Sequence, residues 1–567
     1  MSAKGTTFGR LSAVAGYENP RAMVRKFFLP VGVTVVLLSI IIPLVMAVPW
    51  WTGIVVFIVG GVFVAGYPFI EYNSYKQSIN RNLHYFITYA GTVSTVDIPR
   101  TKLFEKISQN ENFGYISQVF ERIQYLAKDW NLGYAKATRE MSKKVPSPIL
   151  ADFLDRFAVA LDFGESISVF MEEEQESIME DFRVEYEQSL ETIKLLQDTF
   201  VALSISFSFL LGISLMAPLL LEVRIESILP YAVGFILFVD VAILLAVRNY
   251  IPTDSLIHSL ANKSREQERL GNIFWSVFGG SMILFMILFL FTPFSFLVSL
   301  AMGMTPMMIP GVMAIQYESK VERRDKQFPV FVRVLGSAIE VRDGAVVSSL
   351  KSTQIHEFGA LNKLAIALYR RLRVGSDRWE SWYYFALESG STMISNFSKI
   401  FSESVYMGGE SQRIGELVST SSQELLSLRK LRGQVANGLR GSFYGTLIGL
   451  SSVIYITAKV AELLIGIFSQ PLTSESGDLG FAQNVLPQAE SINFTVILAY
   501  ISALIVLHSA ASSFIMKAID GGSWYAGIVD FIIMIWIGAL LSMFLPFMVD
   551  QLLPNVEDLT VAANATG

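Results

Sequence analysis

Five ionisable side chains lie inside long apolar stretches of this chain: Asp240, Lys459, Glu462, His508 and Asp530. A charge buried in lipid is costly, so each of these residues is a candidate for a functional role. Lys459 and Glu462 are three residues apart and can pair on one face of a helix. One interpretation is an ion pathway or a charge-coupled hinge. The structural alternative is polar contact between helices packed inside a bundle.

No known catalytic, cofactor or metal site is found in the sequence. The four histidines, His84, His258, His356 and His508, are isolated from one another, which disfavours a zinc site. A phosphate-binding loop of the Gly-x-x-x-x-Gly-Lys-Ser/Thr type and a Gly-x-Ser-x-Gly nucleophile motif are both missing. Cysteine is absent, which excludes disulfides and cysteine-bound metals. The net charge of −6 gives no indication of nucleic acid binding. The sequence therefore predicts a protein that is not an enzyme.

Basic residues gather in three short clusters of the second half of the chain. The clusters are Lys320, Arg323, Arg324 and Lys326; Arg370, Arg371 and Arg373; and Arg429, Lys430 and Arg432. Residues 316–442 hold 18 basic and 13 acidic side chains, net +5, whereas residues 71–199 hold 14 and 21, net −7. The difference favours different partners for the two segments. Solvated helix faces attracted to anionic lipid are the alternative.

Nine apolar stretches are each close to the roughly 20 residues that cross a bilayer as a helix. They cover 27–48, 51–70, 200–221, 229–247, 273–291, 294–313, 443–468, 494–515 and 525–545. The 567 residues are 52% hydrophobic and 17% charged, where soluble proteins have about a quarter charged residues. The fold class predicted is an all-α polytopic membrane protein with about nine transmembrane helices and two cytoplasmic antiparallel helical bundles.

The distribution of Lys and Arg orients the chain in the membrane. With the amino terminus inside, only Arg224 of the 44 basic residues falls outside, and Lys459 falls within a span. Arg21, Arg25 and Lys26 precede the first span on the inner side, as the positive-inside rule favours. We therefore expect a multi-pass protein of the cytoplasmic membrane, with its amino terminus inside and its carboxyl terminus outside.

These observations divide the chain into nine segments. They are an amino-terminal segment 1–26, a transmembrane pair 27–70, an acidic helical domain 71–199, a second pair 200–247, a linker 248–272, a third pair 273–315, a basic helical domain 316–442, three transmembrane helices 443–545 and an outer tail 546–567. Apolar residues follow helical spacing in both domains. Residues 165–198 and 411–440 each predict one long helix that continues into the following span.

The two halves of the chain, 27–247 and 273–545, show local sequence echoes that predict an internal duplication. Residues 83–91 match 328–336, and Gly133 corresponds to Gly375. A Gly-Glu pair follows a Phe-rich helix in each half, at Gly164-Glu165 and at Gly409-Glu410. The offset stays within 242–245 residues. Chance similarity between amphipathic helices is the alternative.

The layout of two helical domains, each followed by spans and each with a Gly-Glu turn before a long membrane-entering helix, resembles the type II secretion F domain family. The resemblance covers about residues 20–545, and the presence of two copies with nine spans is similar to archaeal platform proteins. It implies a non-enzymatic, dimeric scaffold at the base of a type IV pilus-like filament, with the archaellum as the first candidate. It also implies a cytoplasmic hexameric motor ATPase (FlaI/ArlI-like) and pilin-like or archaellin subunits as partners.

Within this resemblance, we expect the basic domain to bind the ATPase through its first two clusters, with the third as a further candidate, because complementary charge raises association rate and specificity. The Gly-Glu turns are assigned to structure: glycine for a tight connection and glutamate as a first-turn charge favoured by the helix dipole. Three other functions stay open: the platform of an adhesion pilus or related secretion system, a secondary transporter, and a membrane-bound enzyme.

Overall fold

The computed structural model describes residues 82–96, 99–220, 225–251, 254–468 and 494–552, together with a few isolated residues before them. The predicted amino-terminal segment 1–26, the predicted spans 27–48 and 51–70, and the tail beyond Leu552 lie outside the described residues. All described elements are helices, and the one β-bridge among these residues joins Ile257 to Ser391.

The chain divides into two compact units. Among the described residues, the first unit comprises 82–189, 254–260 and 321–429, and is called the domain unit below. The second comprises 190–251, 261–320, 430–468 and 494–552, and is called the span unit. Three long helices contribute residues to both units: α9 (Ile167–Leu220), α13 (Met308–Glu340) and α18 (Ser411–Phe468).

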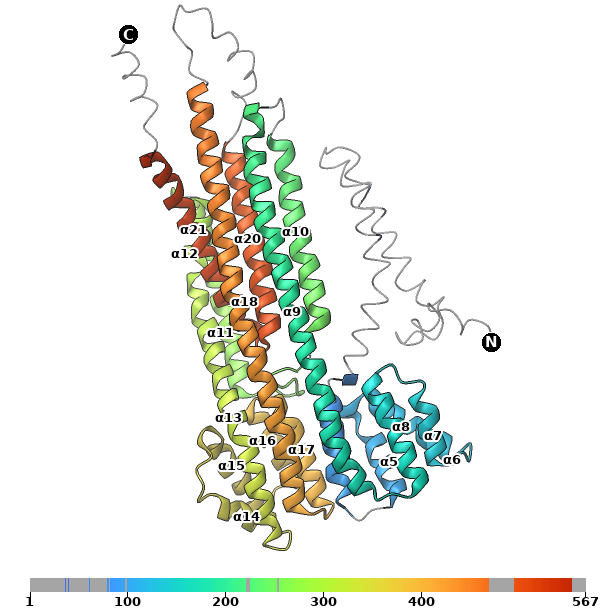
Figure 1. Ribbon diagram of the computed structural model, residues 1–567. Helices are drawn as coiled ribbons and strands as arrows, with labels where there is room; N and C mark the ends of the chain where they lie inside the picture. The colour runs from blue at the N-terminus through green and yellow to red at the C-terminus, as the bar shows by residue number, and fades with distance from the viewer. Residues whose placement is uncertain are drawn as a thin grey trace, which may run out of the picture. The chain divides into compact units, whose positions relative to one another are not determined.

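The domain unit contains two sets of six helices in the same order (Figure 1). The first copy consists of a helix over 82–94, α5 (Arg100–Gln109), α6 (Tyr115–Lys128), α7 (Tyr134–Ser142), α8 (Pro148–Phe163) and the start of α9. The second consists of the end of α13, α14 (Val346–Thr353), α15 (Asn362–Val374), α16 (Arg378–Ser389), α17 (Thr392–Tyr406) and the start of α18. Each copy has a 3-10 turn between its second and third helices, η2 (Glu111–Phe113) and η4 (Gly359–Leu361). The repeated order agrees with the predicted duplication.

Local sequence explains where the short helices begin and end. The Ser147 hydroxyl accepts a hydrogen bond from the Leu150 N–H, and Pro148 occupies the first turn of α8, where its missing N–H costs nothing. Gly375 ends α15 with φ 85°, a left-handed conformation that glycine adopts without steric cost. Short helices with such ends fit a compact bundle.

Fully buried phenylalanines form the core of each copy. The first copy contributes Phe86, Phe104, Phe120, Phe153 and Phe157, and the second Phe328, Phe331, Phe385, Phe397 and Phe401. The rings of Phe104 and Phe157 stack at 5.5 Å between centroids. Large aromatic side chains bury much apolar area each, which compensates for the shortness of the helices.

The described part of the span unit and the long helices supplies seven helices that are long and apolar enough to cross a membrane. They correspond one for one to the seven predicted spans from 200–221 onward. Besides the three long helices, the unit contains α10 (Ile225–Tyr250), α11 (Arg265–Phe291), α12 (Phe296–Met304), α20 (Phe494–Asp520), η6 (Trp524–Ala526) and α21 (Gly527–Leu552). The all-α polytopic class is confirmed. Two of the nine predicted spans lie outside the described residues, so the count of nine stays a prediction.

Two features of the long helices are notable. The 54 residues of α9 and the 58 of α18 each form one continuous helix, as predicted for both segments. The predicted span 294–313 is not regular α-helix throughout: α12 gives way to the 3-10 turn η3 (Thr305–Met307), which contains Pro306, and α13 then begins. Proline favours such a break because it lacks an N–H and clashes with the preceding turn. The predicted domain start at residue 316 falls inside α13.

Candidate docking surface and charge network

Six of the ten basic residues proposed for docking are exposed. They are Lys320, Arg323, Lys326, Arg370, Arg373 and Lys430. Lys320 lies 3.4 Å from the Glu266 carboxylate, and both side chains are about half exposed, at 57% and 46%. An ion pair of this kind contributes little to stability. These six side chains are therefore accessible to a partner.

Arg324 and Arg432 are instead bound to the carboxyl ends of helices. The Arg324 guanidinium donates to the carbonyl oxygens of Glu388 at 3.1 Å and Ser389 at 2.8 Å, at the end of α16. Arg432 is 5% exposed and donates to Ile519 and Ala518 at the end of α20. The last carbonyls of a helix have no partner within it, so a cation there both satisfies them and complements the helix dipole. These two arginines hold elements together.

Arg429 forms a nearly buried ion-pair group in the domain unit. Its side chain is 13% exposed and donates to both oxygens of Asp254, at 2.5 and 2.9 Å, and to Asp325 at 2.7 Å. Asp325 lies on α13, Arg429 on α18 and Asp254 in the segment that the sequence predicts as a linker. A guanidinium suits this place because its planar fork binds a carboxylate with two hydrogen bonds.

Arg371 is paired within its own copy, whereas its neighbours are not enclosed. Its guanidinium contacts the Glu388 carboxylate and lies over the Tyr384 ring, 5.3 Å from the centroid. Arg373 is exposed, with its guanidinium carbon 6.0 Å from the Tyr369 centroid. Of the second basic cluster, Arg370 and Arg373 are thus the side chains that present charge outward.

The segment 254–260, predicted as a linker, packs on the end of α16 in the domain unit. The His258 ring nitrogen Nε2 lies 3.0 Å from the Leu387 carbonyl oxygen, and the His258 N–H donates to Gly390 at 3.1 Å. Burial lowers the pKa of His258 below its ordinary value, which favours the neutral ring. Sequence reasoning misses this contact, because an isolated histidine in a polar stretch carries no pattern.

Gly164 ends α8 as the sequence predicts. It has φ 73°, and the next residue, Glu165, donates its N–H to Ala160 at 3.0 Å. In the second copy, the equivalent left-handed residue is Gly408, with φ 87°, and Gly409 donates its N–H to Ser404 at 3.2 Å. The structural match to Gly164 is therefore Gly408, one residue before the Gly409 of the Gly-Glu pair.

Gly409 serves close packing instead of a turn. A Cβ atom there would lie 2.7 Å from the Thr95 hydroxyl and 3.0 Å from Val96, both in the first copy. Neither Glu165 nor Glu410 lies in the first turn of the helix that follows, which corrects the dipole role expected for them. The α18 amino terminus is satisfied by Glu340, whose carboxylate accepts from the Ser411 N–H at 2.8 Å.

Small and polar side chains join the two copies inside the domain unit. The Thr88 hydroxyl lies 2.7 Å from that of Ser421, and the Ser404 hydroxyl lies 2.9 Å from that of Thr92. Gln175 of α9 also donates to Ser421, at 2.8 Å. The relevant signal in the sequence is the row Thr88, Thr92 and Thr95 with Gly91 between them, at helical spacing.

Asp240 pairs with His508 in the span unit. The two carboxylate oxygens lie 3.1 and 3.2 Å from His508 Nδ1, and the side chains are 1% and 0% exposed. The Phe200 ring stacks on the imidazole at 5.7 Å. The contact joins α10 to α20, which run side by side in Figure 1. Of the two interpretations of this aspartate, polar contact between helices is the one that the geometry supports.

Lys459 bridges two helices of the same unit. Its ammonium lies 3.2 Å from Glu462, as the spacing along α18 predicts, and 3.1 Å from Asp550 near the end of α21. Asp550 could not be identified as a partner from sequence, because it is 91 positions away. The group ties α18 to α21.

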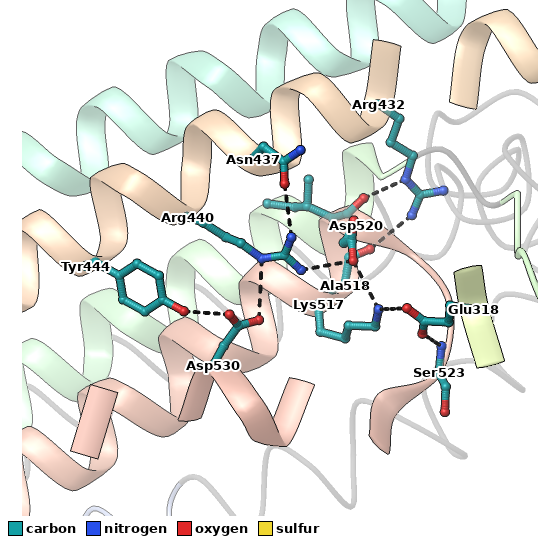
Figure 2. Close-up of polar contacts among 11 residues, drawn as sticks. Glu318, Arg432, Asn437, Arg440, Tyr444, Lys517, Ala518, Asp520, Ser523 and Asp530 are labelled. Carbon is teal, nitrogen blue, oxygen red and sulfur yellow. Dashed lines mark hydrogen bonds and ion pairs between the residues drawn. The ribbon is translucent and has the colours of Figure 1, made fainter. Parts of the chain in front are cut away.

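Figure 2 shows a larger charge network that joins α13, α18, α20 and α21. At its centre, the nearly buried Lys517 ammonium lies 2.9 Å from Glu318 and 3.0 Å from Asp520. Glu318 also accepts a hydrogen bond from the Ser523 N–H at 2.5 Å. One ammonium thus balances two carboxylates, Asp520 on its own helix α20 and Glu318 on α13.

Arg440 extends this network along α18. Its guanidinium lies 3.1 Å from Asp520 and 3.5 Å from Asp530. The Tyr444 hydroxyl donates to Asp530 at 2.6 Å. Asp530 is one of the intramembrane charges identified from the sequence, whereas Glu318 and Lys517 are not, because each lies at the end of an apolar stretch where charges are common. Within the described ranges, no group of three His, Asp or Glu side chains is arranged to hold a metal ion.

Comparison with known proteins places this geometry in a family. The family model for the type II secretion system protein F matches residues 86–215, which is the first copy with the beginning of its span. Flagella accessory protein J of Methanocaldococcus jannaschii is 30% identical over 552 residues, which cover 94% of this chain and 96% of that protein. Flagella accessory protein J of Methanococcus voltae is 28% identical over 90% of this chain and 91% of its own length. No solved structure gives a significant match.

Proposed function

Since the chain belongs to the flagella accessory protein J family, we propose that it is the membrane platform of the archaellum, a type IV pilus-like filament machine. The observation that carries the proposal is the identity along nearly the whole chain, because both F-type copies and the described spans are included. The domain unit then belongs in the cytoplasm, with residues 71–199 and 316–442 as its two F-type domains. The carboxyl terminus lies outside the cell.

The platform couples a cytoplasmic hexameric ATPase, FlaI/ArlI-like, to assembly of archaellin or pilin-like subunits. Four exposed basic side chains of the domain unit support this role: Arg323, Lys326, Arg370 and Arg373. They lie in a segment of net charge +5. We assign them to docking, and we assign Arg324, Arg371, Arg429 and Arg432 to the internal contacts described above. Cycles of the ATPase move or rotate the platform, which acts as a homodimer.

Docking through charge is tested by reversing it. The double variant Arg370→Glu, Arg373→Glu should bind the ATPase more weakly, with a slower association rate and a smaller dependence on salt, because steering by opposite charge is lost. Surface plasmon resonance with the full-length protein in detergent measures both quantities. Lys136→Glu, an exposed reversal in the acidic first copy, is the matched control. Unchanged association at low salt would show that the ATPase docks elsewhere.

The wider role is tested in the native host. Deleting the gene should abolish swimming filaments, and the intact gene should restore them. Loss of thin adhesive fibres alone would identify an adhesion-pilus platform instead. Filaments of every kind persisting in the deletion strain would defeat the platform proposal and favour a transporter, whose uptake would then depend on Asp240 or on Lys459.

A further inference from the structure

A cleft of about 450 Å³ opens between the two copies within the domain unit. Its walls come from α5, the η2 turn and the helix over 82–94 on one side, and from α16 and α17 on the other. A volume of this size is within the range that proteins use for small-molecule ligands, and such sites often lie between domains. Its inner end narrows into a pocket of about 20 Å³, enough for one water molecule.

The cleft lies beside a part of the contact between the two copies that is closely packed. Thr92 and Ser404, hydroxyl to hydroxyl, are 2.9 Å apart, and Gly409 has no room for a Cβ atom. Tyr89, one turn before Thr92, and Glu403, next to Ser404, line the cleft from the two copies. The cleft therefore lies directly beside a closely packed contact between the two copies.

The lining carries an unusual set of charges. The ammonium groups of Lys106 and Lys399 come from opposite copies, and Glu403 is the carboxylate that lines the cleft with them. Lys399 lies 3.8 Å from Glu403. Burial raises the pKa of Glu403 above its ordinary value, against the opposing effect of the two lysines. Two ammonium groups beside one carboxylate leave a net positive charge for an anion.

Aromatic and amide side chains complete the lining of the cleft. Trp379 is 43% exposed at the cleft, and its ring is held edge-on by Tyr406 at 5.5 Å. The Arg378 guanidinium lies over both rings, at 4.9 and 4.8 Å, which fixes their place. Side-chain amides at Gln109, Asn110 and Asn112 supply both hydrogen-bond donors and acceptors. An aromatic face with amides beside it suits a heterocyclic base.

We propose that this cleft binds a nucleotide, with its phosphates at Lys106 and Lys399 and its base at Trp379. We assign nucleotide binding to this cleft, and no reaction. Because Lys106 and Lys399 belong to different copies, a nucleotide whose phosphates contact both lysines bridges the copies. The platform then responds to a small molecule at the junction of its two F-type domains, independently of the ATPase.

Equilibrium dialysis of the full-length protein in detergent with ATP and with GTP tests the site. We expect saturable binding of one nucleotide per chain, and a Kd at least tenfold higher for Lys106→Ala, Lys399→Ala and for Trp379→Ala. Lys102→Ala is the matched control, because Lys102 is exposed on the same helix, one turn from Lys106, and does not line the cleft. The melting temperature of each variant verifies that it is folded.

Three outcomes would overturn the proposal. One is the lack of saturable binding up to about 1 mM of either nucleotide, a Kd that corresponds to about −4 kcal/mol. A second is equal affinity for inorganic pyrophosphate, which would show a simple anion site without base recognition. The third is binding that the cleft variants leave unchanged while they remain folded, which would place the nucleotide elsewhere.

Discussion

At the scale of single residues, Arg429 is a nearly buried cation that lies between two carboxylates. It is bound to Asp254 and Asp325, and replacing it with methionine would leave two carboxylates without their cation in a nearly buried place. Breaking a buried pair from one side costs about 3–5 kcal/mol. We therefore expect Arg429→Met to lower the melting temperature of the purified protein markedly.

The adjacent residue provides the control for this prediction. Lys430 is exposed, so Lys430→Met should change the melting temperature little. Arg429→Lys should rescue only part of the loss, because an ammonium cannot reproduce the paired hydrogen bonds to Asp254. Equal effects of Arg429→Met and Lys430→Met would contradict the assignment of Arg429 to the interior.

His84 predicts a pH dependence of stability. It is 1% exposed, and its ring lies 3.9 Å from Tyr85 and 4.7 Å from Phe182. Burial lowers its pKa from 6.5 to about 4, with Asp254 opposing the shift and Arg429 adding to it. The unfolded chain binds a proton more readily, so stability is complete above about pH 6.5 and falls as the pH decreases toward 4.

The expected loss between pH 7 and pH 5 is about 2 kcal/mol from this residue. Melting temperatures at the two pH values measure it, and His84→Phe should flatten the difference by removing the titrating ring. His356→Phe is the control, because His356 is exposed. A pH dependence that survives His84→Phe in full would assign it to other groups.

Residue types alone cannot separate the buried from the exposed basic residues found in one cluster. Arg429 and Lys430 are neighbours in sequence, yet one is enclosed and the other is free to face a partner. The enclosing residue, Asp254, is 175 positions away in a polar segment without any pattern. Only the fold brings the two together. By contrast, the pair Lys459–Glu462 is predictable, because three residues along a helix set its geometry.

At the scale of elements, the network of Figure 2 predicts that four helices are energetically coupled. Lys517→Met should destabilise the protein by about 3–5 kcal/mol, because Glu318 and Asp520 lose their shared cation. The double variant with Glu318→Gln should lose less than the sum of the two single losses, with a coupling of about 1–3 kcal/mol. Thermal unfolding in detergent of all four proteins measures this cycle.

The control for this cycle is Lys320→Met with Glu266→Gln. That pair is solvent-exposed on both sides, so its coupling should be below about 1 kcal/mol. Similar coupling in the two cycles would mean that burial at Lys517 has no energetic effect, against the prediction.

The elements themselves are largely predictable. The continuity of α9 follows from the lack of Gly and Pro before Gly212, whereas α18 stays helical through Gly433, Gly438 and Gly441. The break at Pro306 and the shift from Gly409 to Gly408 are not predicted, because both depend on which of two or three adjacent residues takes an irregular conformation. When the two copies are aligned on the Gly-Glu pair, Gly164 is matched to Gly409, one residue after its structural equivalent Gly408.

At the scale of the whole molecule, the absence of cysteine gives a clean test of orientation. Ser348→Cys lies in α14 at an exposed position, and Ser474→Cys lies between α18 and α20, outside the described residues. With the proposed orientation, a membrane-impermeant maleimide should label Ser474→Cys on intact cells and Ser348→Cys only after lysis. Labelling of Ser348→Cys on intact cells would invert the topology.

Two similar helical copies in one chain also have an evolutionary consequence. When a homodimer is symmetric, every substitution appears on both partners, and its two faces must stay alike. Covalent fusion removes that constraint, so each copy can drift alone. The opposite net charges of −7 and +5, and a serine at 421 that accepts from both Thr88 and Gln175, are differences that such a chain can accumulate. Two copies of a domain within one chain can therefore differ from each other and still occur in a fixed one-to-one ratio.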